Sequence, residues 1–307
     1  MRNFIIDTDT ASDDAVALVM AMRQPDIDVK AITVVAGNVP LPMALQNALF
    51  TVELCGAETP VYAGCAKPLL RELETAQDVH GRDGMGDIGL PLHGREPADG
   101  HAADMLRKLI NANAGDITLV TLGPLTNVAL ALLREPELAG HVSHCYIMGG
   151  IGSGHGNVTP TAEYNIWVDP EAAKIVFESG MAMTMVGWDI SWKYATFDAE
   201  EAAEIRRIGT PLAEFVVDIQ ATLTEFSMTE NALAGFDLPD PITMAAAIDP
   251  GVAEYKDYRV EVTTREGLAR GITVVDVLGV SKKAPQMRVA TSANRAAFVD
   301  MLKRSVS

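Results

Sequence analysis

Residues 4–15, FIIDTDTASDDA, place four aspartates between an apolar strand and an apolar helix. Residues 4–6 have the composition of a short buried strand, and the apolar run from Ala15 is typical of a buried helix that stops near Pro25. The acids therefore fall at the carboxyl end of a strand and in the first turn of a helix. Ligands of open α/β sheets bind at that edge, so this stretch predicts both a fold class and a site.

The close spacing of the carboxylates needs a physical explanation, because four negative charges within eight residues repel each other. A hard divalent cation such as Ca²⁺ or Mg²⁺ is the simplest answer, since both ions prefer carboxylate oxygens. A plainer interpretation makes Ser12 or Asp13 the N-cap of the following helix. A cap uses one such side chain rather than four acids, so the cluster favours a metal or ligand site.

Strand-like and helix-like segments alternate through the first two thirds of the chain. Strands are expected at 4–6, 27–36, 60–63, 117–122, 142–148 and 181–186, and helices at about 41–55 and 98–113, after 126 and from Asp169-Pro170. This alternation predicts an α/β fold with a mostly parallel central sheet covered by helices on both faces.

The pattern changes after residue 198. Helices are expected over 199–248, broken by a loop at about 227–239, followed by short strands at 258–263, 272–277 and 286–290 and a closing helix from about 292. The short strands predict a small antiparallel appendage near the C-terminus. With no internal repeat and no linker-like segment, we interpret residues 1–307 as one domain.

Composition excludes several classes of partner. The formal net charge is −17, which argues against binding to nucleic acid or to an anionic membrane, because both need basic patches. The three cysteines, Cys55, Cys65 and Cys145, form no metal-site spacing and suit a reducing cytoplasm. The chain starts directly with a strand, so we expect no signal peptide, and no apolar run approaches the length of a membrane helix.

Polar residues recur where further strands of the sheet should end. Asn38 follows the second strand, Leu122-Gly123 and Met148-Gly149-Gly150 follow two later ones, and Asp240 precedes a late helix. Asn157, Glu163 and Asn165 lie in the loop after Gly150. Carboxylates and carbonyls suit a divalent cation, and amides suit a polyhydroxylated ligand because they offer donors and acceptors together.

These blocks, taken in order, resemble the calcium-dependent nucleoside hydrolases, the inosine–uridine-preferring nucleoside N-ribohydrolase family. The matching residues are the cluster from Asp7 to Asp14, Gly123-Pro124-Leu125-Thr126-Asn127, Met148-Gly149-Gly150, Ala162-Glu163-Tyr164-Asn165, Asp169-Pro170-Glu171-Ala172-Ala173 and Asp240-Pro241. The resemblance covers nearly the whole chain. It implies an enzyme that hydrolyses the N-glycosidic bond of ribonucleosides to free base and ribose, as a homodimer or homotetramer.

The resemblance also implies roles for individual residues. Asp9, Asp14, Asp240 and the carbonyl of Leu122 would hold Ca²⁺, which would bind one water and the ribose 2′- and 3′-hydroxyls. Asp9 would be the general base that deprotonates this water. The ribose would be bound by Asp13, Asn38, Met148, Asn157, Glu163 and Asn165. His80 would lie near the base, although a solvated loop histidine is an equally good interpretation of it.

The sequence departs from the family pattern at the leaving-group position. Many members have a histidine immediately before the last aspartate, where it protonates the departing base. Here that residue is Pro239, which cannot donate a proton. His80 and Glu230 are candidate replacements. Trp188 and Trp192 could stack on a base, although packing is the more common role of such residues.

Two alternatives belong to other functional classes. Asp7-Thr8-Asp9-Thr10 after a strand also fits a haloacid dehalogenase-like phosphatase, with Asp7 as nucleophile and Asp9 as acid/base. That class needs a late acidic pair, and Asp276 alone is a poor match. The loss of histidine at 239 also fits a calcium-dependent nucleoside- or sugar-binding protein without catalysis.

Overall fold

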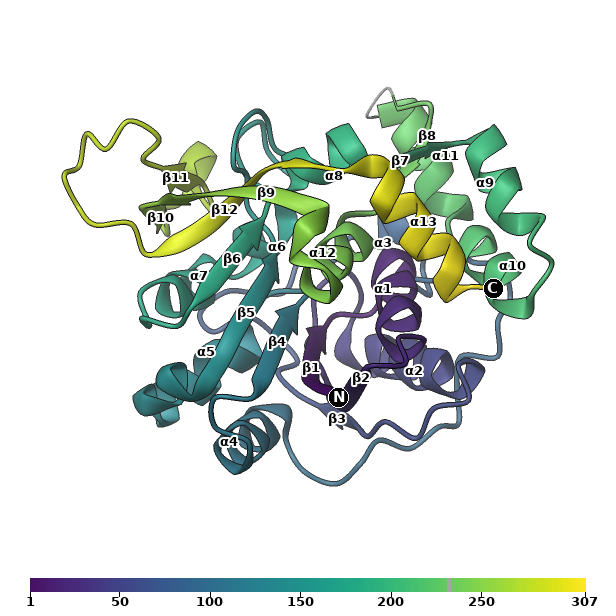
Figure 1. The fold of residues 1–307 in the computed structure, drawn as a ribbon, viewed down its shortest axis with the longest axis horizontal. Coiled ribbons are helices and arrows are strands. Elements are labelled where there is room, and N and C mark those ends of the chain that lie inside the picture. Colours follow the sequence, from purple (N-terminus) through teal and green to yellow (C-terminus); the bar gives the residue numbers. More distant parts are fainter. Residues whose placement is uncertain (231–232) are drawn as a thin grey trace.

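One large sheet organises the chain (Figure 1). The computed structural model describes residues 1–230 and 233–307. The sheet has eight strands in the order β3-β2-β1-β4-β5-β6-β12-β9. All neighbouring strands run parallel except β9, which is antiparallel to β12 at the edge. The strands of this sheet are β1 (Arg2–Thr8), β2 (Ile27–Val34), β3 (Val61–Ala63), β4 (Ile117–Thr121), β5 (Val142–Met148), β6 (Met183–Val186), β9 (Ala253–Tyr258) and β12 (Met287–Ala293).

Helices cover both faces of the sheet, as the alternation predicts. They are α1 (Ser12–Met22), α2 (Leu41–Leu54), α3 (Gln77–His80), α4 (Ala102–Ala112), α5 (Thr126–Arg134), α6 (Tyr164–Val168), α7 (Pro170–Phe177), α8 (Trp188–Tyr194), α9 (Ala199–Arg206), α10 (Pro211–Asp218), α11 (Ala221–Glu230), α12 (Pro239–Ile248) and α13 (Arg295–Ser305). In Figure 1, α4, α5 and α7 lie on one side and α1, α2, α12 and α13 on the other. The predicted α/β fold is confirmed.

Alternating side chains of the strands divide the interior into two cores. In β1, Phe4 and Ile6 join the core beneath α1 and α12, whereas Ile5 joins the core beneath α4, α5 and α7. This is the period of two that a strand buried on both faces requires. The sheet is therefore held from both sides, and its carboxyl edge has a fixed shape.

The direction of strand order reverses between β1 and β4. The chain moves from β1 outward through β2 to β3, then returns to place β4 on the other side of β1. The loops that leave β1 and β4 consequently diverge, and a crevice opens between them. Asp9 follows β1 and Leu122 follows β4, so this reversal brings the two predicted metal-site residues together.

Helix α1 begins without a side-chain cap. Its N-cap is Ala11, so the plainer interpretation, in which Ser12 or Asp13 caps the helix, is wrong. Asp14 instead reaches back and accepts a hydrogen bond from the Ala11 backbone N–H at 2.9 Å. Every residue from Ser12 to Ala21 is buried, because α1 lies between the sheet, α2 and α12.

The last third of the chain differs in detail from expectation. The strand expected at 286–290 is β12, and it belongs to the central sheet rather than to the appendage. The appendage itself is confirmed as the antiparallel pair β10 (Val260–Val262) and β11 (Thr273–Val275). A second antiparallel pair, β7 (Thr196–Asp198) and β8 (Gly235–Asp237), was not expected. It divides the loop expected at 227–239, in which residues 231–232 lie outside the described residues.

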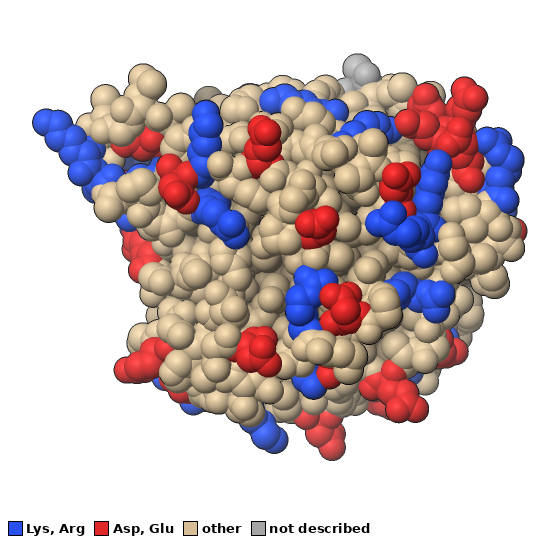
Figure 2. Space-filling model, in the orientation of Figure 1, with Lys and Arg blue, Asp and Glu red and all other residues tan. Residues whose placement is uncertain are grey.

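The charge surplus is divided between the surface and the interior. On the face shown in Figure 2, acidic and basic side chains are interspersed. Nine aspartates and glutamates are nevertheless buried within the described part of the chain, against a single buried arginine, Arg270. No helix among residues 1–230 and 233–307 is long and apolar enough to cross a bilayer.

Asp7 links three segments beneath the carboxyl edge. Its Oδ2 accepts hydrogen bonds from Thr33 Oγ1 at 2.5 Å and Asn127 Nδ2 at 2.9 Å. The amide oxygen of Asn127 accepts a further bond from the Cys65 N–H at 2.8 Å. Burial raises the pKa of Asp7 to about 7, so these hydrogen bonds offset part of the cost of burying a carboxyl group. Asp7 therefore has a structural role.

We predict that Asn127→Ala lowers the free energy of unfolding by about 2–4 kcal/mol, because it removes one of the two hydrogen bonds to the buried Asp7 carboxyl and leaves the Cys65 N–H without a partner. Urea unfolding at pH 7 measures this change. Asn111→Ala is the matched control, since exposed Asn111 contacts only Glu135 and His141 in solvent-exposed hydrogen bonds, and it should cost less than about 0.5 kcal/mol. Equal costs for the two variants would contradict the role given to Asn127.

Candidate active site

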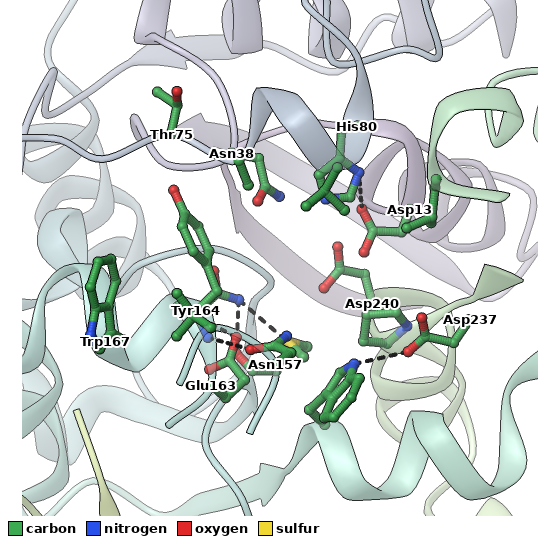
Figure 3. A pocket seen from close by; sticks show the side chains of 18 of the residues that line it. Asp13, Asn38, Thr75, His80, Asn157, Glu163, Tyr164, Trp167, Asp237 and Asp240 are labelled. Carbon is green, nitrogen blue, oxygen red and sulfur yellow. Dashed lines mark hydrogen bonds and ion pairs between the residues drawn. The ribbon is translucent and has the colours of Figure 1, made fainter. Parts of the chain in front are cut away.

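A cavity of about 330 Å³ opens at the carboxyl edge of the sheet (Figure 3). Nine of the predicted metal- and ribose-site residues, His80 included, line it: Asp13, Asn38, His80, Leu122, Met148, Asn157, Glu163, Asn165 and Asp240. Asp9 and Asp14 do not line it and are fully buried. The structure thus gathers residues from positions 13 to 240 around one space of the size of a small ligand.

An acidic cluster forms one wall of this cavity. Carboxylate oxygens of Asp13, Asp14 and Asp240 all lie within 4.8 Å of one another. Asp9 is not a member of this group of three, but its charge raises the pKa of Asp240, as do those of Asp14 and Asp13. The structure therefore places Asp13, predicted as a ribose contact, among the candidate metal ligands.

Asp9 is enclosed by backbone on two sides. Its Oδ2 accepts a hydrogen bond from the Asn38 N–H at 2.6 Å, after β2. Gly37 and Gly123 approach its carboxylate so closely that a Cβ at either position would collide with it. Two glycines are needed here because the loops after β2 and β4 pack directly on the Asp9 side chain.

The cluster carries uncompensated charge. Burial raises the pKa of Asp13 to about 7 and that of Asp14 to about 6, and it raises the pKa of Asp9 and Asp240 well above the ordinary range. Within the described residues, Asp9 Oδ1 and Asp13 Oδ1 are buried without a hydrogen-bond partner. Buried carboxylates with spare oxygens fit a divalent cation, which would replace the missing partners.

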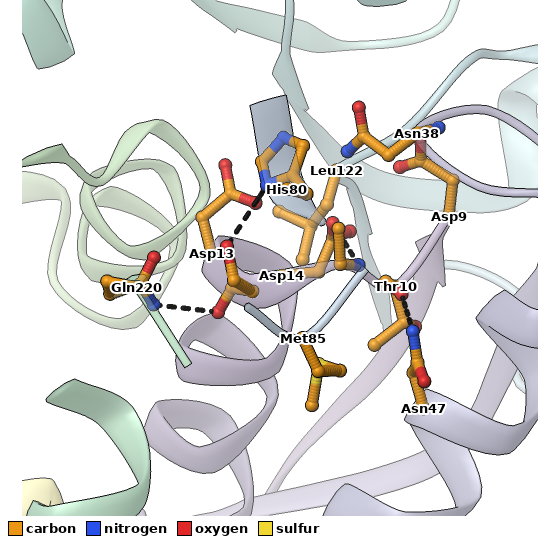
Figure 4. A network of polar contacts seen from close by, with 12 residues as sticks. Asp9, Thr10, Asp13, Asp14, Asn38, Asn47, His80, Met85, Leu122 and Gln220 are labelled. Carbon is orange, nitrogen blue, oxygen red and sulfur yellow. Dashed lines mark hydrogen bonds and ion pairs between the residues drawn. The ribbon is translucent and has the colours of Figure 1, made fainter. Parts of the chain in front are cut away.

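The loop that carries these acids is tied to three parts of the chain (Figure 4). Asp14 accepts hydrogen bonds from Thr8 Oγ1 at 2.5 Å and from the Ala11 N–H. Asn47 on α2 donates to the carbonyl of Thr10 at 3.0 Å, and Gln220 donates to the carbonyl of Ser12 at 3.0 Å. These contacts hold the acids in place against their mutual repulsion.

The opposite wall is built around Glu163, the N-cap of α6. Its carboxylate accepts hydrogen bonds from the N–H groups of Gly150, Asn165 and Ile166 at 2.7–3.2 Å. Burial raises the pKa of Glu163 to about 7. Asn165 donates to the carbonyl of Leu122 at 2.6 Å. This wall therefore connects the glycine-rich loop after β5 with the loop after β4.

Two further predicted residues lie on this wall. Asn157 accepts a hydrogen bond from the Tyr164 N–H at 3.0 Å. Met148, the last residue of β5, offers its carbonyl and sulfur to Asn165 at 3.4 and 3.2 Å. Tyr164 and Trp167 complete the wall, and Arg270 stacks on Trp167 with its guanidinium 3.8 Å from the ring centre.

His80 is part of the cavity rather than a solvated loop histidine. It ends the short helix α3, is 7% exposed, and has Nδ1 3.0 Å from Ser12 Oγ and 3.7 Å from Asp13 Oδ1. Burial lowers its pKa to about 4, so the ring is neutral at pH 7. A neutral imidazole can still donate one hydrogen bond into the cavity.

The remaining end of the cavity contains residues that sequence reasoning missed or misjudged. Asp237, at the end of β8, is buried and lines the space with Trp188, Leu223, Phe226 and Pro239. The indole of Trp188 donates to Asp237 Oδ2 at 2.9 Å. Asp237 precedes Asp240 by three residues, which was the one available signal.

Two candidates from the sequence lie away from the cavity. Glu230 is exposed at the end of α11 and is not among the lining residues, so this structure gives it no contact with a ligand. Trp192 packs on Trp188 with ring centres 5.2 Å apart and also does not line the space.

Asp7, the nucleophile of the phosphatase alternative, is fully buried and hydrogen-bonded elsewhere, so that alternative is wrong.

Comparison with known proteins finds similar sequences along nearly the whole chain. Residues 4–300 match a family described as "Inosine-uridine preferring nucleoside hydrolase". The chain is 39% identical over 300 residues to the pyrimidine-specific ribonucleoside hydrolase RihA of Salmonella agona (strain SL483), covering 97% of this chain and 96% of that protein. RihA of Escherichia coli (strain SE11) is 38% identical over the same shares.

Solved structures agree. A plant nucleoside hydrolase, the PpNRh1 enzyme, matches with a TM-score of 0.94 at 34% identity, covering 100% of this chain and 99% of that one. The purine-preferring ribonucleoside hydrolase from Gardnerella vaginalis matches with a TM-score of 0.92 at 30% identity, covering 99% and 98%.

We predict that the metal-free protein loses stability as the pH rises from about 4 to about 7. Asp13 and Asp14 keep their protons to about pH 7 and 6 in the folded state, whereas the ordinary value is 3.8. The folded state therefore binds more protons than the unfolded chain in this window, and the free energy of unfolding falls as they are released.

Saturating CaCl₂ or MgCl₂ should reverse this loss and raise the Tm by about 4–8 °C at pH 8, with a smaller rise at pH 5. Thermal unfolding in chelator and in each salt measures the effect. A metal-free Tm that stays constant or increases between pH 5 and 8 would contradict the charge state assigned to the cluster.

Proposed function

The chain belongs to the inosine-uridine preferring nucleoside hydrolase family, and from that membership we propose how it hydrolyses ribonucleosides to free base and ribose. The proposed site holds calcium through Asp9, Asp14, Asp240 and the carbonyl of Leu122. Asp9 is the proposed general base. The observation that carries this proposal is the set of buried carboxylates with unpartnered oxygens beside the cavity.

Calcium suits this donor set, because it accepts six to eight oxygen ligands, carboxylates and backbone carbonyls included. When bound, it would supply a positive charge that orients a water and the ribose 2′- and 3′-hydroxyls and lowers the pKa of the water. Asp13 lies in the same cluster and offers an oxygen without a protein partner, which supports a contact with the 2′-hydroxyl.

Asp9 has the properties of a base in this reaction. Burial raises its pKa, so the carboxylate gains the affinity for a proton that abstraction from water requires. Its Oδ2 is held by the Asn38 N–H, and its Oδ1 has no partner within the described residues. One oxygen is therefore fixed while the other remains available for the proton.

The ribose contacts act mainly by orientation. Asn38, Asn157, Glu163 and Asn165 would hold the 3′- and 5′-hydroxyls, with C1′ facing the water. Breaking the N-glycosidic bond builds positive charge on the ribose ring, as in other glycoside hydrolyses. The carboxylates of Asp13, Asp240 and Glu163 line the cavity and would stabilise this charge.

The leaving base has few proton donors available. Pro239 lines the cavity where a histidine would protonate the base. Among the candidates raised by the sequence, only His80 reaches the cavity, and its lowered pKa makes it a hydrogen-bond donor rather than an acid at pH 7. The relatives are described as pyrimidine-specific or purine-preferring, so we propose that the base end of the cavity decides the preferred base.

A homodimer or homotetramer is the proposed assembly.

We predict that Asp9→Asn lowers kcat at least about a hundredfold, because the amide cannot take the proton of the water. Ribose release from inosine, adenosine, guanosine, uridine and cytidine, with and without chelator, measures the activity. Asp7→Asn is the matched control and should retain most activity. Loss in Asp7→Asn alone would contradict the assignment of the base, and binding of ribosides without ribose release would favour the non-catalytic alternative.

We predict that Pro239→His raises kcat for neutral nucleosides by at least about tenfold, because it adds a proton donor at the leaving-group position. Proline occupies the first position of α12, where its missing N–H is not needed by the helix, so histidine should be tolerated. Pro239→Ala removes the ring without adding a donor and should not raise kcat. Equal effects of the two variants would show that the proline ring, not proton supply, limits the reaction.

A further inference from the structure

Asp237 adds a carboxylate at the end of the cavity where the base leaves. It is 4% exposed, lines the cavity, and accepts hydrogen bonds from Trp188 Nε1 at 2.9 Å and Ser191 Oγ at 2.8 Å, both at Oδ2. Figure 3 shows it next to Asp240, on the same side of the cavity as Asp13 and His80. Two donors from α8 thus hold the carboxylate in one orientation beside the space for the base.

The whole cavity, like its end at Asp237, carries negative charge. Six carboxylates line it (Asp13, Glu74, Asp78, Glu163, Asp237 and Asp240), and no lysine or arginine of residues 1–230 and 233–307 does. The only histidine among the described lining residues is His80, whose Nδ1 lies 3.0 Å from Ser12 Oγ. The end that receives the base therefore contains a carboxylate, an indole ring and a proline, without a cationic side chain.

This environment opposes the departure of an ordinary base. Without a proton donor, a neutral nucleoside releases its base with negative charge on nitrogen, and Asp237 would repel that charge. A base with a fixed positive charge behaves differently. It becomes neutral as it leaves, so it needs no proton, and the carboxylate and the Trp188 ring both attract it while it is bound.

We propose that this site takes ribosides whose base carries a fixed positive charge, such as N-ribosylpyridinium or N7-alkylpurinium compounds, and that Asp237 is the specificity-determining residue. The inference rests on the proposed ribonucleoside hydrolase function and names its substrate class. Burial raises the pKa of Asp237, whereas the hydrogen bonds from Ser191 and Trp188 favour its charged form, as a bound cation also would.

The reaction balances without an acid. The bond between C1′ and the ring nitrogen breaks with both electrons going to nitrogen, which neutralises the base. The water oxygen forms the new bond to C1′, and its proton passes to Asp9 and then to solvent. The products are ribose, a neutral base and one proton. Pro239 does not slow this reaction, because nothing on the base has to be protonated.

Guanosine and 7-methylguanosine form a suitable probe pair, because they differ by one methyl group and one fixed charge. Steady-state hydrolysis of both, with nicotinamide riboside as a second cationic probe, gives kcat and KM after subtraction of spontaneous hydrolysis. In the wild-type enzyme with calcium, kcat/KM for 7-methylguanosine should exceed that for guanosine at least about tenfold.

The decisive comparison is Asp237→Asn, which can still accept hydrogen bonds from Trp188 and Ser191 but removes the charge. The ratio of kcat/KM for 7-methylguanosine to that for guanosine should fall about tenfold, chiefly through a higher KM for the cation. Asp78→Asn removes a charge from an exposed residue at the rim and should change the ratio less, because solvent screens that charge.

The outcomes separate the two proposals. Absence of hydrolysis of every riboside would overturn the proposed function itself. Hydrolysis of guanosine with a ratio that Asp237→Asn leaves unchanged, or changes no more than Asp78→Asn does, would overturn only the role of Asp237. If Asp237→Asn does not fold, Pro239→His supplies the second measurement. It should lower the same ratio by accelerating guanosine alone, and an equal gain for both probes would overturn the inference.

Discussion

Mutual repulsion between buried carboxylates is the constraint on which the rest of this structure depends. Four aspartates meet here although they come from three segments: Asp9 follows β1, Asp13 and Asp14 lie in the first turn of α1, and Asp240 lies at the start of α12. The backbone N–H of Asn38 holds Asp9 in place. The pKa of each is raised by burial, so the folded chain without metal keeps protons that the unfolded chain would lose. In the proposed site, a divalent cation would replace those protons and would also provide the charge that hydrolysis needs. Under the proposed function, stability and activity would therefore depend on the same four side chains.

The cavity wall built around Glu163 shows how one residue can serve two purposes. Glu163 caps α6 with three backbone hydrogen bonds, and Asn165 bridges the loops after β4 and β5 through the carbonyl of Leu122. These contacts fix the side chains before any ligand arrives, so little conformational entropy remains to be lost on binding. The same arrangement explains why the loop from Gly149 to Asn165, which contains little regular structure, still forms a defined surface. Its order comes from side chains that also line the cavity.

Local sequence patterns predicted most of the sheet, because strands buried on both faces and helices between them have clear periods. The strand expected at 142–148 is β5 itself, and the cluster after β1 was visible from spacing alone. Asp240 was a candidate ligand because it precedes a late helix, and family resemblance supported it, although nothing local says that residue 240 meets residues 13 and 14. Asp237 was missed because β8 has three residues and its partner Trp188 lies 49 positions away. The strand at 286–290 was recognised but misplaced, because its alternation fits a sheet edge and a separate hairpin equally well.

The packing of α1 against α12 has a consequence for the folding of the protein during translation. These helices are joined in one core although more than 200 residues of chain separate them. The aspartates near residue 10 emerge first, and for most of synthesis they have neither Asp240 nor the wall of α12 beside them. The strands β1 to β6 can assemble as they appear, since all six lie side by side in one part of the sheet. Asp240 lies about four fifths of the way along the chain, so the nascent protein acquires the complete acidic cluster only late in translation.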